Sequence, residues 1–339
     1  FSAELLVLAV CTFLTAATLF SQTPSQAPPP IPGSTPNLPP PPGQSTRPSN
    51  NRIRSEVDLV VLRATVVGKD GNFVPGLSRD NFRVFEDKVE QRLTVFHQED
   101  TPVTVGLVID NSGSMREKRA QVNAAALRLV ESSNPQDEVF VVNFNDDYYL
   151  DLDKDFTNDP KDLKQALERI DSRGGTAFYD ALVGSLDHLK KGHKDKRVLL
   201  VITDGEDQDS TKTFEYALHA AQQSTAVIYA IGVYGEEDRK NDRVRMKAAK
   251  RNLKTLADAT GGAAYFPNSL TELAEICAEI ARDIRNQYTL GYNPTNVAQD
   301  GSFRSVQVQV LPPRNSGKLT VRTRSGYYAP KPSNSSSGN

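Results

Sequence analysis

Apolar residues follow different patterns along the chain, and each pattern predicts a different kind of secondary structure. In the stretch 57–97, Val, Leu and Phe alternate with polar residues around the turn KDGN, which predicts four short antiparallel strands. Further on, four apolar runs (VTVGLVID, EVFVVNF, RVLLVIT and AVIYAIGVY) are separated by helical stretches. Apolar strands that alternate with helices indicate a parallel sheet covered on both faces. The β pattern then returns in FRSVQVQVL and KLTVRTRSGYY.

We therefore expect an α/β fold, with a doubly wound, mostly parallel sheet and helices on both faces, inserted in or flanked by a small antiparallel β domain. The α/β segment spans 103–286, and the β segments 53–102 and 287–329 lie on either side of it. Neither β segment has enough strands to be stable alone. We expect the two to pair with each other into one small sandwich.

The last helix of the α/β segment has a well-defined apolar face. Leu273, Ile276, Cys277, Ile280 and Ile284 recur at steps of three and four residues, as the inner face of a helix requires. Cys277 lies on this face, so we expect it to be a buried and unreactive thiol.

The two ends of the chain have compositions that differ from a globular core. The apolar run 5–20 is short for a membrane span and suits a signal peptide. We expect residues 1–21 to be a signal peptide with a truncated start, or an uncleaved membrane anchor. Residues 22–52 are Pro-rich and predict a disordered linker, and 330–339 predict a disordered tail. Whether residues 1–21 are a signal peptide or an anchor, we expect the bulk of the chain to lie outside the cytoplasm, as a secreted, periplasmic or cell-surface protein.

Charge and cysteine content narrow the functional classes. The chain has 40 Lys and Arg against 42 Asp and Glu, a net charge of −2, which gives no electrostatic case for binding nucleic acid. Two cysteines in the sequence exclude a disulfide framework and a thiolate zinc site. The chain also lacks a nucleophile elbow, a phosphate loop and a dinucleotide fingerprint.

Oxygen-bearing side chains gather where the apolar runs end. The run VTVGLVI is followed by Asp110, Ser112 and Ser114, and the run RVLLVIT by Asp204. Between them, SRGGTAFYDAL places Thr176 at a helix start. Ligands of doubly wound sheets bind outside the carboxyl ends of the strands, so we expect these five residues to converge. Three of them also have an ordinary explanation when taken alone. Ser114 or Thr176 could be a helix N-cap, and Asp204 with Gly205 could form a turn.

The residue types select the ion that such a site would hold. Two carboxylates that face each other without a cation repel, and a divalent cation removes that repulsion. Oxygen ligands without His or thiolate favour Mg²⁺ or Mn²⁺ over Zn²⁺, and the carboxylates are few for Ca²⁺. Neighbours that could support the five ligands are Asn111, Gly175, Gly205, Glu206 and Asp207.

The set resembles the metal-ion-dependent adhesion site of von Willebrand factor type A domains. DNSGSM matches its D-x-S-x-S signature, and Thr176 in GGTAFYD and Asp204 in ITDGED match its other two motifs in spacing and order. The resemblance covers roughly 103–285 and implies the Rossmann-like fold of that family. The flanking segments VPGLSRDNFRVFEDKVEQ and YTLGY…RSGYYAP resemble those around this domain in secreted bacterial proteins of the acidobacterial type.

The resemblance also implies a role for each ligand. Ser112 and Ser114 would bind the metal directly, Thr176 directly or through water, and Asp110 and Asp204 mostly through water. The last position would take an Asp or Glu carboxylate from a partner protein. We therefore expect a metal-dependent protein-binding module of the adhesion type, and no enzyme. Two other interpretations remain. One is a structural subunit of an envelope assembly with a metal site that serves stability only. The other is a metal-dependent hydrolase.

Overall fold

The computed structural model describes residues 59–98, 100–132, 134–169, 171–204, 207–235, 243–313 and 317–331. The predicted signal peptide or anchor, the Pro-rich linker and most of the predicted tail lie outside these residues. Within the described part of the chain, no helix combines the length and the apolar composition that crossing a membrane requires.

The middle of the chain forms one sheet with the strand order β10-β9-β8-β5-β6-β7. Neighbours from β10 to β6 are parallel, and β7 is antiparallel to β6. The strands are β5 (Val103–Asp110), β6 (Glu138–Phe144), β7 (Tyr148–Leu150), β8 (Lys196–Thr203), β9 (Val227–Gly232) and β10 (Ala264–Tyr265). The predicted α/β fold with a mostly parallel sheet is confirmed.

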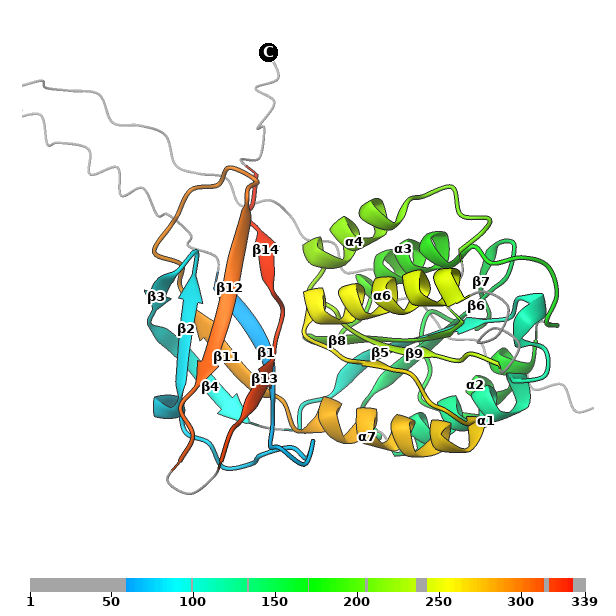
Figure 1. Cartoon of the computed structure of the whole chain (residues 1–339), viewed down its shortest axis with the longest axis horizontal. Helices are drawn as coiled ribbons and strands as arrows, with labels where there is room; N and C mark the ends of the chain where they lie inside the picture. Colours follow the sequence, from blue (N-terminus) through cyan, green and yellow to red (C-terminus); the bar gives the residue numbers. More distant parts are fainter. Residues whose placement is uncertain are drawn as a thin grey trace, which may run out of the picture. The chain divides into compact units, whose positions relative to one another are not determined.

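Helices cover both faces of this sheet (Figure 1). One face carries α1 (Arg119–Glu131), α2 (Pro160–Glu168) and α7 (Leu273–Arg285), and the other carries α3 (Phe178–Leu189), α4 (Phe214–Gln223) and α6 (Arg243–Thr260). Short 3₁₀ turns occur at η1 (Arg79–Asn81), η2 (Gly113–Met115) and η3 (Leu270–Glu272). All eight residues of β5 are buried, as a central strand with both faces covered requires.

Two buried residues, Gly106 and Cys277, show how closely this domain is packed. A Cβ on Gly106 of β5 would stand 2.4 Å from a ring carbon of Phe140 and 2.5 Å from a methyl of Leu199, so the side chains of β6 and β8 pack over β5 at a point that needs a glycine. On α7, Cys277 is fully buried in the apolar face predicted for this helix. Burial raises the pKa of its thiol to about 12, which keeps the thiol protonated.

The two β segments form two antiparallel sheets, β13-β1-β11-β4 and β14-β12-β2-β3. Their strands are β1 (Val60–Val67), β2 (Phe82–Glu86), β3 (Val89–Gln91), β4 (Leu93–Gln98), β11 (Tyr288–Tyr292), β12 (Phe303–Val310), β13 (Thr320–Arg322) and β14 (Gly326–Tyr328). Strand β11 pairs with β1 and β4, and β12 pairs with β2, so the segments before and after the α/β region share both sheets. Side chains from both sheets meet in one core that includes Leu62, Val84, Leu290 and Val306.

Polar contacts connect this β domain to the α/β domain. Only two residues separate the end of helix α7 from the start of β11. The Asp283 carboxylate of α7 forms an ion pair with Arg322 of β13. The Gln287 side-chain amide donates to the Tyr229 hydroxyl at 3.3 Å. The two domains are therefore joined by a partly buried ion pair as well as by the chain itself.

A buried lysine lies near the same junction. Lys196, the first residue of β8, is 3% exposed, and its ammonium group donates to the carbonyl oxygen of Ile284 at the end of α7. Burial, with a smaller contribution from the nearby charge of Arg63, lowers the pKa of Lys196 from 10.5 to about 7. Between these two values the unfolded chain binds one more proton than the folded chain, so this group makes stability rise with pH.

We predict that Lys196→Met removes this rise. In urea unfolding between pH 7.5 and 9.5, the free energy of unfolding of the wild type should increase with pH by up to about 1.4 kcal/mol per pH unit more than that of the variant. Lys164→Met, which removes an exposed lysine from α2, is the matched control and should keep the wild-type slope. Equal slopes for the wild type and Lys196→Met would contradict the prediction.

Candidate functional site

Asp110 is the last residue of β5, and its carboxylate is held in place by the chain around it. It is 1% exposed. One carboxylate oxygen accepts the backbone N–H of Ser112 at 2.8 Å, and the other accepts the hydroxyl of Thr203 at 2.6 Å. Thr203 is the last residue of β8, so the ends of two adjacent parallel strands fix the position of this acid.

Two serines connect the β5 loop to the second acid. The hydroxyls of Ser112 and Ser114 are 3.1 Å apart. Ser114 donates to a carboxylate oxygen of Asp204 at 2.5 Å. Asp204 directly follows β8 and is 6% exposed. The structure thus brings four of the five predicted ligands together at one edge of the sheet.

The fifth predicted ligand lies on a neighbouring loop. Thr176 is 3% exposed, and the loop just before it is bound to the β5 loop by the Gly113 N–H, which donates to the Gly174 carbonyl at 3.1 Å. The backbone N–H of Thr176 donates to Asp209 at 2.8 Å. Among the described contacts, no hydrogen bond joins the Thr176 hydroxyl to the other four ligands.

Two carboxylates pack against the Gly174–Gly175 pair. Gly174 has a φ of 73°, a conformation that favours glycine. A Cβ on Gly175 would stand 1.7 Å from a carboxylate oxygen of Asp209, and the Gly175 N–H donates to Asp146 at 2.5 Å. The glycine pair therefore allows two acidic side chains to hold the loop that carries Thr176.

The ordinary helix-cap explanation does not account for these hydroxyls. The N-cap of α1 is Lys118 and that of α3 is Ala177, so neither Ser114 nor Thr176 occupies a cap position. Asp207 acts at the start of α3 instead, where its carboxylate accepts the N–H of Tyr179 at 3.1 Å. A residue expected to support the metal ligands thus serves a helix N-terminus.

The other predicted supporting residues have separate roles or are not described. Asn111 is fully buried, and its side-chain amide donates to Asn143 of β6 at 2.7 Å. Gly175 binds Asp146 through its backbone, as above. Gly205 and Glu206 lie outside the described residues.

Burial and mutual repulsion make it unfavourable for Asp110 and Asp204 to be ionised at the same time. Burial, followed by the charge of Asp204, raises the pKa of Asp110 to about 7. Among the described residues, no Lys or Arg forms an ion pair with Asp110. No group of three or more His, Cys, Asp and Glu side chains in the described chain could hold a metal ion. A cation at this edge would therefore depend on hydroxyl oxygens as well as carboxylates.

Sequence reasoning missed several residues that shape this edge. Thr203 donates a hydrogen bond to Asp110, and Asn143 accepts one from Asn111. Asp146 and Asp209 accept hydrogen bonds from the loop that carries Gly174, Gly175 and Thr176. Thr203 stands next to Asp204 in ITDGED, so its position at a strand end was a usable signal. Asn143, Asp146 and Asp209 carry no such signal in the sequence, because their hydrogen-bond partners lie about thirty residues away in the chain.

Sequence comparison identifies the domain that carries these loops. Residues 105–206, which include all five predicted ligands, match the family described as the von Willebrand factor type A domain. The chain contains a von Willebrand factor type A domain. A curated relative, the uncharacterized protein sll0103 of Synechocystis sp., is 28% identical over 114 residues. This match covers 33% of the present chain and 27% of the relative, so the chain spans about a quarter of that protein's length.

Solved structures similar to this chain include other von Willebrand factor A domains. A von Willebrand factor type A protein from Catenulispora acidiphila is 13% identical, with a TM-score of 0.48 and 76% of each chain covered. The conserved hypothetical protein BatB from Bacteroides thetaiotaomicron is 22% identical, with a TM-score of 0.42 over 54% of this chain and 100% of that one. The vWF domain of the type V pili tip protein Mfa5 from Porphyromonas gingivalis is 14% identical, with a TM-score of 0.45 over 55% and 95%.

We predict that Asp110→Asn stabilises the von Willebrand factor A domain in EDTA at pH 8. The amide keeps an acceptor for the Ser112 N–H and removes a buried charge that faces Asp204. The free energy of unfolding should rise by about 1 kcal/mol or more, since each unit of pKa shift corresponds to about 1.4 kcal/mol. Urea unfolding measures this, with Asp153→Asn, at an exposed acid, as the control. A less stable Asp110→Asn in EDTA would show that the carboxylate is stabilising without a cation.

Proposed function

We propose that this chain is a metal-dependent protein-binding module that acts outside the cytoplasm. Asp110, Ser112, Ser114, Thr176 and Asp204 would hold one Mg²⁺ or Mn²⁺ ion. A bound divalent cation would offset the repulsion between the two carboxylates and attract an Asp or Glu side chain of a partner protein. The observation that carries the proposal is the buried pair of Asp110 and Asp204. The two acids are linked through the Ser112 N–H and the hydroxyls of Ser112 and Ser114.

The donor set supports Mg²⁺ or Mn²⁺ in this position. Hydroxyl and carboxylate oxygens are hard ligands of the kind these ions bind in proteins. Asp110 is already oriented by the Ser112 N–H and the Thr203 hydroxyl, so its carboxylate needs no large rearrangement. The two serine hydroxyls are neutral, and neutral ligands leave more of a cation's charge available to an incoming carboxylate.

The hydrolase interpretation has less support at this site. Hydrolysis would require a general base or nucleophile beside the metal ligands. The acids of the neighbouring loops already accept structural hydrogen bonds. Asp207 accepts the Tyr179 N–H at the start of α3, and Asp146 and Asp209 accept the N–H groups of Gly175 and Thr176. We therefore place the chain among binding proteins rather than enzymes. The apolar run 5–20 and the Pro-rich 22–52 support a tethered or secreted location.

The first test is cation-dependent stability. Mg²⁺ should stabilise the wild type by mass action, by about 2.7 kcal/mol at a concentration of 100 times the dissociation constant. Asp110→Ala should lose this increase. Ser112→Ala should lose less of it, because water can replace a neutral hydroxyl. Thermal melting with Mg²⁺, with Mn²⁺ and with EDTA measures the effect, and Asp153→Ala is the exposed-acid control. A wild type that melts identically in all three buffers would refute the metal site.

The second test concerns the partner. The wild type should retain proteins from an envelope extract in Mg²⁺ and release them in EDTA, and Asp110→Ala should retain none of these proteins. For a partner identified in this way, replacing one exposed Asp or Glu by Asn or Gln should abolish binding. Cation-dependent melting without any cation-dependent partner would favour the structural subunit with a stability-only metal. Binding that survives neutralisation of every exposed acid on the partner would contradict carboxylate capture.

A further inference from the structure

A second site lies at the opposite end of the parallel sheet from the metal ligands. It is a cavity of about 640 Å³ between the outer face of the sheet β13-β1-β11-β4 and the residues that begin β8 and β9. Asp195 and Arg197 stand at the start of β8, whereas Asp204 follows its end. Eight residues of strand separate the two ends, a distance of about 23 Å at the usual rise per residue. The cavity is therefore distinct from the candidate metal site.

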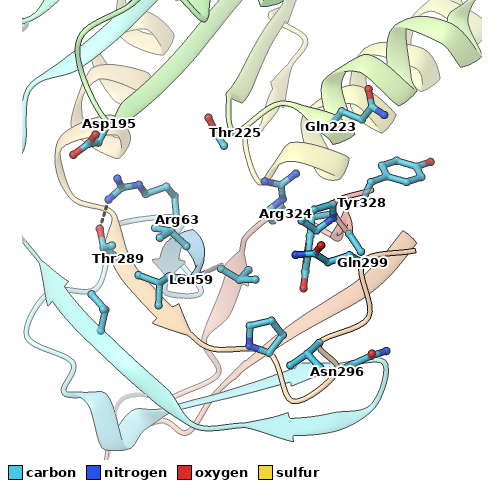
Figure 2. Close-up of a pocket in the computed structure, with 18 of the residues that line it drawn as sticks. Leu59, Arg63, Asp195, Gln223, Thr225, Thr289, Asn296, Gln299, Arg324 and Tyr328 are labelled. Atoms are coloured by element: carbon cyan, nitrogen blue, oxygen red, sulfur yellow. Dashed lines mark hydrogen bonds between the residues drawn. The ribbon is translucent and has the colours of Figure 1, made fainter. Parts of the chain in front are cut away.

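Three arginines line this cavity. Figure 2 shows Arg63 and Arg324 in the cavity wall, with Thr225 of the α/β domain nearby. Arg197 is the third. Among the described residues, none of the three has a carboxylate within the 4.0 Å of an ion pair. The single acid in the lining, Asp195, is exposed and leaves the cavity with an excess of positive charge.

The hydrogen bonds of these arginines go to neutral groups. Arg63 donates to the Thr289 hydroxyl. Arg324 donates to the carbonyl oxygens of Gln222 at 2.6 Å and Ser224 at 3.1 Å. The Nε of Arg197 is buried and has no hydrogen-bond partner in the described structure. Burial lowers the pKa of both Arg63 and Arg324. For Arg63 the nearby charge of Asp195 offsets this effect only in part.

Apolar side chains form the other part of the lining. Leu59 and Val61 of the β1 region are 44% and 40% exposed, and Val297 is 58% exposed. Their exposed surfaces open onto the same cavity as the arginines. A cavity of this size, with a mostly apolar wall and a few charged groups, has the usual form of a small-molecule site. Arginine binds carboxylate and phosphate groups through paired N–H donors.

We propose that this cavity binds a small organic anion that carries a carboxylate or phosphate group beside an apolar portion. Arg63 and Arg197 bind the anionic group, and Leu59, Val61 and Val297 contact the apolar portion. Arg324 has a more structural part, since its guanidinium holds the end of α4 against the β domain. The site does not depend on the proposed metal-dependent function, because the two lie at opposite ends of β8.

The test uses the fluorescent anion 8-anilinonaphthalene-1-sulfonate as the probe, with the full chain in EDTA. We expect saturable binding at one probe per chain. Arg63→Gln and Arg197→Gln should each weaken binding at least tenfold. Val61→Trp, which fills the cavity without changing the charge, should also weaken it at least tenfold. Arg128→Gln, at an exposed arginine on α1, and Asp153→Ala, at an exposed acid, should bind as the wild type does. Circular dichroism and melting temperature establish that each variant is folded.

Competition tests the chemistry of the ligand. Octanoate should displace the probe, and 1-octanol, which has a chain of the same length without the charge, should not. Displacement by inorganic phosphate as effective as that by octanoate would remove the apolar part of the proposal. Equal displacement by octanoate and 1-octanol, or wild-type affinity in folded Arg63→Gln and Val61→Trp, would overturn it.

Discussion

Strand β5 is buried over all eight of its residues, and this constraint organises the α/β domain. A strand buried on both faces needs a hydrogen-bonded neighbour on each edge and a covering layer on each face. The chain supplies β6 and β8 as neighbours, and glycine at 106 leaves room for the Phe140 and Leu199 side chains of these strands. Because the neighbours are parallel, the polar residues that follow β5 and β8 must emerge at the same edge. The juxtaposition of Asp110 and Asp204 is a direct consequence of that topology.

The surroundings of Asp110 keep an unfavourable pair of acids in place. Its carboxylate accepts from the Ser112 N–H and the Thr203 hydroxyl, and Asp204 accepts from Ser114. These hydrogen bonds favour the charged forms, whereas burial and mutual repulsion oppose them. The net effect is the raised pKa of Asp110. The proposed cation would offset this repulsion. The loop that carries Gly174 and Gly175 is bound to the β5 loop and brings Thr176 to the same edge.

The two candidate sites lie at opposite ends of β8. Acids follow the carboxyl ends of β5 and β8, while Arg197 and the arginines of the β domain gather where β8 begins. The β domain completes the basic end, since Arg63 comes from β1 and Arg324 from the segment between β13 and β14. The proposed cation and the proposed organic anion would therefore bind at opposite ends of β8. The ion pair of Asp283 with Arg322 fixes the last helix to the β domain near this basic end.

The sequence by itself determined the fold class, the segment that carries the von Willebrand factor A domain, the apolar face of α7 and the loops at the strand ends. These features depend on local periodicity and short motifs, which a single sequence displays directly. Tertiary structure decided which polar groups meet. The pairing of Thr203 with Asp110 and the helix-capping role of Asp207 depend on contacts between separate elements. The arginine cavity joins residues from positions 63 to 324. No local pattern encodes such contacts, because their geometry exists only after the strands have paired and the helices have packed.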